Sequence, residues 1–309
     1  MSTNLKLLLM AAISVLAVFS CTKHEDVLDK EINVVVSAGV MTRAGYSGTE
    51  ILPENFVMDI VQNVDSKYDY KSILMVKDGD KNTFSPEPYS KMVWAVNSFG
   101  GVEVKAMTLP YEMESVDPDN SMTINVSAYQ STEVEILKSD LLAAATQKSG
   151  ITITDGTIKI DFAHQLSKID VKYILSDGLT PSDVTIYSAT LENVCVQGGY
   201  SYAEMAFDED IEQAIGSISM YHNLTDNTFE AIFLPFIPSV NPRLVVKAKV
   251  CDQERVLTCP VTAKDANGFM SGKRYMLNVS FKRNSIAVNS VDIAEGWDTE
   301  TDDNTFDTI

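Results

Sequence analysis

"ITITDGTIKIDFAHQLSKIDVKYIL" (residues 151–175) alternates apolar and polar side chains on both sides of an Asp-Gly pair. Alternation with a period of two is typical of β-strands that bury one face, and Asp-Gly is a strong signal for a tight hairpin turn. Ile158 and Ile160 fall on one face, whereas Ile169 falls on the other. A change of face requires an extra residue, so we expect a bulge or bend near Ser167.

The same alternation recurs along the chain, with turn residues between the segments. We predict further strands at 31–40, 56–64, 70–76, 91–96, 102–109, 121–129, 184–196, 230–237, 243–250, 255–263, 273–281 and 285–297. One segment differs, because "SDLLAAATQKSG" (139–150) predicts a short helix with Ser139 as N-cap and Gly150 as its stop. Many short strands predict an all-β fold of the sandwich or barrel type.

The N-terminal segment has the pattern of a secretory leader. Residues 7–19 are almost entirely apolar, which suits a signal peptide and is too short to span a bilayer. The run ends at Cys21 and resembles a bacterial lipobox. The resemblance implies cleavage before Cys21 and acylation of its thiol and of the new amino terminus, which would anchor the protein to the outer membrane. The alternative is a plain secretory signal with a chance cysteine.

Composition limits the possible partners and bonds. The chain has 24 basic and 43 acidic residues and a net charge of −19, so a nucleic-acid partner is not expected. No apolar run after Cys21 is long enough to cross a membrane. An odd number of cysteines remains in the body, so no complete disulfide framework is expected. These are Cys195, Cys251 and Cys259, and a hairpin turning at 252–255 would keep the last two too far apart to bridge.

Motifs of catalysis and metal binding are missing from the sequence. Three histidines show no metal spacing, and neither a nucleophile elbow nor a phosphate-binding loop occurs. We therefore predict no enzyme, no cofactor and no metal site, although a glycosidase pair among the many carboxylates stays open. His164 lies at the expected bend, where a hydrogen bond to neighbouring backbone is favoured over a ligand or pH-sensitive role.

Two further features admit a binding role. The tail carries Asp298, Glu300 and Asp302 at alternate positions, like the start of a calcium loop, but it lacks the required glycine and final glutamate. We expect a solvated acidic end, with a loose cation site as the alternative. Sugar stacking is an option for the aromatic residues Tyr89, Trp94, Tyr111, Tyr129, Tyr200 and Tyr202. Most of these are expected in the core or at its rim.

Three features together resemble the fimbrillin family of Bacteroidetes, which comprises fimbrial subunits and related lipoproteins. They are the leader ending at Cys21, the pair "SDLLAAAT" (139–146) and "IDFAHQLSKIDVKY" (160–173), and the close "KRYMLNVSF…SIAVNSVDIAEGW" (273–297). The resemblance implies two transthyretin-like β-sandwich domains in tandem. We divide the chain into a leader at 1–20, a tether and removable first strand at 21–43, and domains at 44–148 and 149–309.

The resemblance also implies a mechanism of assembly. An arginine-specific protease cuts in the first strand region, the freed strand leaves, and a strand of another subunit fills the groove by β-strand addition. Here the cut would fall between Arg43 and Ala44, and the alternative is an ordinary surface arginine. A donor strand within 285–309 would use alternating apolar residues, with a change of face at Asn289 and Ser290. The candidates are Ile286, Val288, Val291 and Ile293, which are equally suited to the last strand of the second domain.

The leader, the strand pattern and the family resemblance together predict a role at the cell surface. The chain is expected to be a lipid-anchored surface protein and a subunit or accessory of an adhesive pilus. Its partners would be other fimbrial subunits, in a homopolymer or heteropolymer, and an unidentified ligand on a host or bacterial surface. The alternative is a stand-alone glycan-binding surface lipoprotein.

Overall fold

The structure is a computed structural model of the chain. It describes residues 32–40, 53–62, 66–79, 81–87, 91–95, 101–117, 119–148, 150–225, 227–264, 266–295 and 297. Two units are distinguished, Met1–Ile32 and Asn33–Ile309, and the sheets below belong to the second. Strands dominate the described residues, which confirms the predicted all-β fold class. The division into two transthyretin-like domains stays a prediction.

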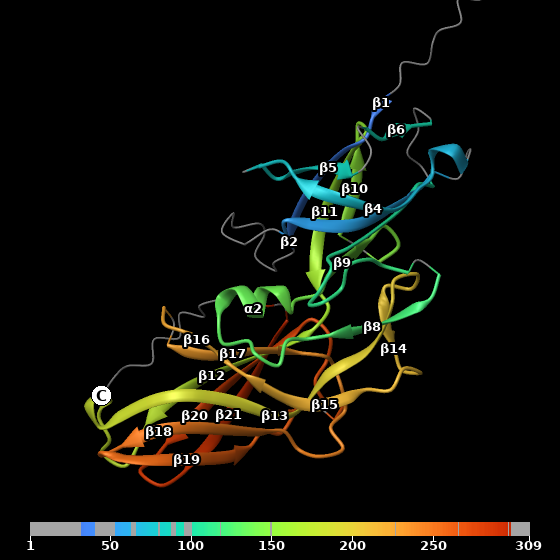
Figure 1. The fold of residues 1–309 in the computed structure, drawn as a ribbon. Coiled ribbons are helices and arrows are strands. Elements are labelled where there is room, and N and C mark those ends of the chain that lie inside the picture. The colour runs from blue at the N-terminus through green and yellow to red at the C-terminus, as the bar shows by residue number, and fades with distance from the viewer. Residues whose placement is uncertain are drawn as a thin grey trace, which may run out of the picture. The chain divides into compact units, whose positions relative to one another are not determined.

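An eight-stranded sheet contains most of the N-terminal strands, in the order β10-β11-β2-β5-β4-β3-β7-β9 (Figure 1). Its strands are β2 (Val35–Val40), β3 (Asn55–Val61), β4 (Tyr70–Lys77), β5 (Thr83–Glu87), β7 (Glu103–Met107), β9 (Leu142–Ala145), β10 (Ile151–Thr154) and β11 (Thr157–His164). β9 also pairs with β11, where Leu142 lies opposite His164. The strands from β11 round to β9 therefore form a closed ring, which leaves no open strand edge along it.

Two further sheets contain the C-terminal strands. The five-stranded sheet has the order β16 (Tyr221–Asn223), β17 (Thr228–Phe233), β12 (Ser167–Leu175), β20 (Lys273–Phe281) and β21 (Ile286–Glu295). The six-stranded sheet contains β14 (Ala206–Asp208), β13 (Val184–Ser201), β18 (Arg243–Val250) and β19 (Gln253–Pro260), with β15 (Ala214–Ser219) and β8 (Ser121–Asn125) also paired to β13. The remaining short elements are β1 (Ile32–Asn33), β6 (Val93–Trp94) and the 3₁₀ helices η1 (Ser66–Tyr68) and η2 (Pro181–Asp183).

These two sheets share a core made by the alternating residues of the sequence. On β18, every second residue from Leu244 to Val250 is buried, and β12 contributes Ile169 and Val171 to the same cluster. Aromatic rings pack in the middle, with Phe233 and Phe269 at 5.2 Å between centroids and Phe269 and Tyr275 at 4.9 Å. Buried apolar area of this kind is the main source of stability in a sandwich.

The bend predicted near Ser167 is confirmed. β11 ends at His164, the chain bends at Leu166, and β12 begins at Ser167. β11 belongs to the eight-stranded sheet and β12 to the five-stranded sheet, so the apolar side chains change face where the chain changes sheet. The Asp-Gly hairpin is also present, with Thr154 paired to Thr157.

The helix predicted at 139–150 is wrong. The helix α2 lies earlier, at Glu133–Lys138, where the Thr132 side chain accepts a hydrogen bond from the backbone N–H of Glu135. Ser139 is the C-cap of this helix, and the alanine-rich residues that follow form the buried strand β9 between β7 and β11. The small side chains of β9 fit the closure of the ring, and this tertiary pairing overrides the helical propensity of alanine.

The predicted domain boundary between residues 148 and 149 falls between β9 and β10. Both strands belong to the eight-stranded sheet, and the last strand of this sheet along the chain, β11, ends at His164. In the other direction, β8 pairs with β13 of the six-stranded sheet. Pairing between strands thus crosses the predicted boundary in both directions, and the boundary stays a prediction.

The hairpin of β18 and β19 is present, but its turn differs from the predicted one. Val250 pairs with Gln253, so the turn consists of Cys251 and Asp252, both with positive φ, rather than residues 252–255. Two positive φ values are typical of a type I′ turn, whose twist matches that of the flanking strands. Cys259 consequently lies opposite Leu244, and all three described cysteines are free thiols.

The three thiols should differ sharply in reactivity. Cys251 is exposed in its turn, whereas burial raises the pKa of Cys195 and of Cys259 to about 11. In protein that starts at residue 21 and carries Cys21→Ser, we expect iodoacetamide to label one thiol in buffer and three in urea. Mass spectrometry of tryptic peptides measures this. Equal labelling of Cys251 and Cys259 in the folded protein would contradict the structure.

Candidate functional site

β2 is an interior strand of the closed ring. It runs parallel to β11, from Val35 opposite Thr157 to Val40 opposite Phe162, and antiparallel to β5. Backbone N–H groups of β2 also donate hydrogen bonds to neighbouring loops. The N–H of Ala38, for example, donates to the carbonyl oxygen of Asn82 at 3.1 Å. Since β2 uses backbone groups on both sides, its loss would leave unpaired groups on both β11 and β5.

The side chains of β2 contribute to the core of the ring. Val36 is 1% exposed and lies opposite Ile158 on β11 and Phe84 on β5. The Phe84 ring contacts that of Phe56 at 4.8 Å between centroids, and Phe56 contacts Phe162 at 5.2 Å. Removal of β2 would therefore uncover a groove with an aromatic and aliphatic floor.

The predicted processing and lipidation residues lie outside the described residues. These are Cys21, Arg43 and Ala44. β2 ends at Val40, which is close to Arg43 in the chain. The acidic tail residues Asp298, Glu300 and Asp302 lie outside the described residues as well.

The predicted donor residues all lie on β21, the edge strand of the five-stranded sheet. They are Ile286, Val288, Val291 and Ile293. β21 pairs antiparallel with β20, and the register shifts so that Val279 faces Val288 while Asn278 faces Ser290. Asn289 is thus the extra residue of a β-bulge, at the place where the sequence changes face. Ile286 is buried and the other three are half-buried.

A groove of about 730 Å³ separates β21 from β19, the edge strand of the other sheet. Its lining comes from residues 258–260, 262–264 and 286–292. The backbone of Val288 lies near the Cys259 thiol, so the two edges approach each other at this point. The two strands are nevertheless not paired with each other, and this side of the sandwich exposes strand edges.

Three residues from separate sequence motifs meet in one cluster. Asp140 belongs to the "SDLLAAAT" segment, His164 ends β11, and Trp297 follows β21. The Asp140 Oδ2 atom lies 2.8 Å from Nδ1 of His164, and the His164 ring stacks on the Trp297 ring with centroids 4.0 Å apart and planes 10° apart. The predicted backbone partner of His164 is therefore wrong, because a carboxylate takes that place.

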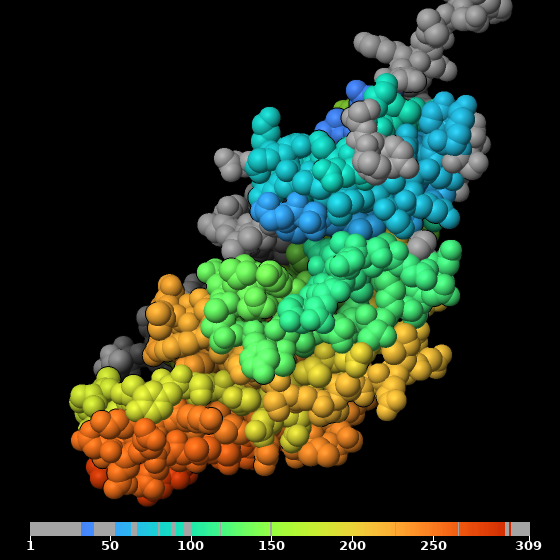
Figure 2. Space-filling model, in the orientation of Figure 1, coloured from blue at the N-terminus to red at the C-terminus, as the bar shows by residue number. Residues whose placement is uncertain are grey.

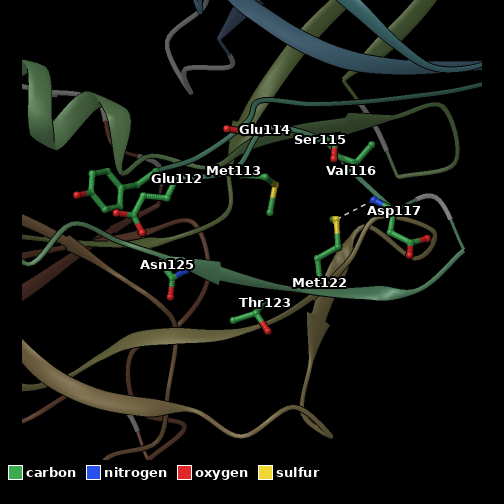
Figure 3. A pocket seen from close by; sticks show the side chains of 10 residues that line it. Glu112, Met113, Glu114, Ser115, Val116, Asp117, Met122, Thr123 and Asn125 are labelled. Carbon is green, nitrogen blue, oxygen red and sulfur yellow. Dashed lines mark hydrogen bonds between the residues drawn. The ribbon is translucent and has the colours of Figure 1, made fainter.

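A surface hollow of about 530 Å³ is lined by residues 111–117 and by residues of β8, the strand that lies on the face drawn in Figure 2; Figure 3 shows this hollow from close by. Its lining includes Glu112, Glu114 and Asp117 together with the apolar side chain of Met113. Hydrogen bonds from the Asn120 side chain and from the backbone N–H groups of Asp119 and Asn120 lower the pKa of Asp117. This carboxylate therefore stabilises its own loop and is poorly suited to proton transfer at neutral pH.

The aromatic residues considered for sugar stacking do not form one platform as far as the structure describes them. Trp94, Tyr200 and Tyr202 are buried, and the Trp94 Nε1 donates to the carbonyl of Gly156 at 2.8 Å. Tyr129 is 74% exposed, and Tyr111 is half-buried at the hollow beside β8. Tyr89 lies outside the described residues.

Two negative findings apply to the described residues. Among them, the structure contains no group of three or more His, Cys, Asp or Glu residues placed to hold a metal ion. No helix in this part of the chain has the length and apolar character needed to span a membrane.

Comparison with known proteins identifies the family. The fimbrillin-like family model matches residues 53–297. A solved structure of a candidate cell adhesion protein from Bacteroides uniformis is similar, with a TM-score of 0.62 and 14% identity, over 86% of this chain and 98% of that chain. A second such protein, from Bacteroides ovatus, has a TM-score of 0.59 and 14% identity, over 87% of this chain and 98% of that chain. These structures support the fold, and no curated protein matches the sequence. The family match covers most of the chain, and the chain therefore belongs to the fimbrillin-like family.

Proposed function

We propose that this chain is a subunit or accessory of an adhesive surface pilus and that it assembles by β-strand exchange after proteolysis. The observation that carries the proposal is the position of β2. It is an interior strand of a closed ring, it precedes all other strands of that ring, and the sequence provides Arg43 shortly after its end. One cut at Arg43 would therefore separate an interior strand from the rest of its sheet.

The energetics favour refilling of the site by another strand. Loss of β2 exposes the edges of β11 and β5 and the apolar side chains of Ile158 and Phe84. An entering strand would restore the backbone hydrogen bonds, and its alternate side chains would occupy the positions of Val36 and Ala38. Until it arrives, the open ring is prone to aggregation, so cleavage should be coupled to assembly.

β21 is the best-supported donor within the described residues. It is an edge strand and the last strand among the described residues, and separation from its sheet breaks one ladder, that with β20. It offers two short apolar segments on either side of the bulge at Asn289, with Ile286 and Val288 in the first and Val291 and Ile293 in the second. The second segment has the alternation of β2, where Val36 and Ala38 are buried.

The proposal also includes the place of the protein in the cell and a role without catalysis. Acylation at Cys21 would attach the precursor to the outer membrane, and the two similar solved structures are candidate cell adhesion proteins, which agrees with a place at the cell surface. The role is binding and assembly without catalysis, as expected of a fimbrillin-like chain. The alternative of a stand-alone glycan binder has less support, because Trp94, Tyr200 and Tyr202 are buried.

Limited digestion tests the proposal. Protein that starts at residue 21 and carries Cys21→Ser is treated with an arginine-specific protease. We expect a new N-terminus at Ala44, followed by a ladder of detergent-resistant oligomers on unboiled gels. The Arg43→Lys variant removes this site and leaves the other arginines unchanged, so it should give no ladder. Resistance at Arg43, or a clean cut that leaves a stable monomer even with a second subunit added, would overturn strand exchange.

A further inference from the structure

The end of β21 is fixed by the cluster of Asp140, His164 and Trp297, which we call the latch. His164 Nδ1 contacts the Asp140 carboxylate at 2.8 Å, and its ring lies flat against the Trp297 ring at 4.0 Å. The side chains of His164 and Asp140 are 17% and 10% exposed, so most of the latch is shielded from water. Trp297 lies two residues after Glu295, at which β21 ends.

The other two latch residues belong to the point where the ring closes. His164 pairs with Leu142 in the short ladder between β11 and β9, and Asp140 lies just before β9. The bend that follows is held to the loop before β20, since the Ser271 hydroxyl donates to the carbonyl of Gln165 and the Gly272 N–H donates to that of Leu166. The latch therefore connects the end of the last strand to a rigid corner of the fold.

Two polar atoms show that the latch is incompletely satisfied. Asp140 Oδ1 and Trp297 Nε1 are buried and have no hydrogen-bond partner in the part of the chain that the structure describes. A buried polar atom without a partner loses the bonds that it would make with water. The ring stack must offset this cost, so the closed latch is more easily opened than a fully bonded contact of equal area.

We infer that this latch keeps β21 on its own sheet and that opening it is the step that frees β21. The inference rests on the proposed function, because it concerns the strand proposed as donor. β21 has one ladder partner, β20, and the bulge at Asn289 interrupts that ladder. Fraying of an edge strand starts at its ends, and the latch holds the C-terminal end. The segment from Val291 to Glu295 should respond first when the latch is broken.

Hydrogen exchange tests the latch directly. In the uncleaved protein that starts at residue 21 with Cys21→Ser, we expect Trp297→Ala to speed amide exchange at Val291–Glu295 about tenfold, from the loss of one aromatic stack and its buried area. Trp297→Phe retains a ring that can stack, and it serves as the matched control with a much smaller change. Asp140→Asn should have an intermediate effect, because an amide still hydrogen-bonds the imidazole.

The possible results of this experiment test the latch independently of the proposed function. Unchanged exchange at Val291–Glu295, or an equal increase in β18 and β19, would overturn the latch, because Trp297 would then act as an ordinary core residue. Faster exchange confined to β21 supports it. The Trp297→Ala protein is then cut at Arg43 and its rate of ladder formation is compared with that of the parent protein. If β21 exchanges faster but the ladder forms no faster, the inference about the latch stands and β21 is not the donor strand.

Discussion

Replacing Arg274 with methionine is expected to lower the free energy of unfolding by about 3–5 kcal/mol, the usual cost of breaking a buried ion pair from one side. Arg274 Nε donates to Oδ2 of Asp170, and both residues are buried between β12 and β20. The Nζ atom of Lys168 lies 3.6 Å from Oδ1 of Asp170, but it is closer to Oε2 of Glu230, at 2.7 Å. The variant would therefore leave Asp170 with one distant, shared cation. Urea unfolding monitored by circular dichroism measures the loss.

A double variant distinguishes a broken ion pair from a packing defect. Asp170→Asn together with Arg274→Met removes both charges, and we expect it to regain more than half of the stability lost by Arg274→Met alone. Glu230 keeps its bonds from Lys168, Asn223 and Thr228 in both proteins. If the double variant is as unstable as the sum of the two single variants, the pair contributes no coupling and the assignment is wrong.

The pH dependence of stability should change in a defined direction. Burial raises the pKa of Asp170 above its ordinary value, despite the nearby Lys168 and Arg274 charges. The folded state then binds the proton more tightly than the unfolded state does. The contribution of Asp170 to the free energy of unfolding is fully present below its pKa in the unfolded state, about 4. It is lost as the pH rises through its pKa in the folded state. Asp170→Asn should flatten the fall in stability above about pH 4.

The local pattern of apolar residues predicted much of the fold. The alternation placed strands such as β18 and β20 within a residue or two of their observed ends. It also located two irregularities, because the changes of face near Ser167 and at Asn289 correspond to a change of sheet and to a bulge. Alternation with a period of two indicates which side chains of a strand are buried, and this pattern can be read from the residues of that strand alone.

Features that depend on distant partners were not predicted. The alanine-rich β9 has no alternation, and it is a strand because β7 and β11 supply its hydrogen bonds. β5 contains Pro86, which argues locally against a strand, and β14–β16 are short and half-exposed. The polar residues Lys168, Asp170 and Arg274 have the pattern of a solvated face, whereas the fold buries them as ion pairs.

The candidate site was predicted in parts but not as an arrangement. The sequence suggested that 31–40 is a strand and that the apolar residues of 285–297 form another, but it gave no sign that the first would be interior and the second an edge. Asp140, His164 and Trp297 were each part of a family motif. Their contact depends on the chain returning to the bend after β11 more than 130 residues later, and local patterns do not contain that information.

Replacing Val36 with aspartate is expected to remove β2 from the ring without any protease, at a cost of roughly 3 kcal/mol or more for a buried, unpaired carboxylate. Val36 is 1% exposed between Ile158 and Phe84, so the charge has no route to water while the strand is in place. Amides of β2, β5 and β11 should lose protection from hydrogen exchange. Those of β18 and β20, in the other two sheets, should retain it.

The neighbouring residue provides the control, because Val35 lies on the same strand and is 46% exposed. Val35→Asp should change stability by less than about 0.5 kcal/mol and leave exchange of β5 and β11 unaltered. Since loss of β2 opens two strand edges, Val36→Asp should also form oligomers that Val35→Asp does not form, as measured by light scattering behind gel filtration. A monomeric Val36→Asp protein with unprotected β5 and β11 would mean that an open ring does not suffice for strand addition. Proteolysis at Arg43 would then have to do more than remove β2.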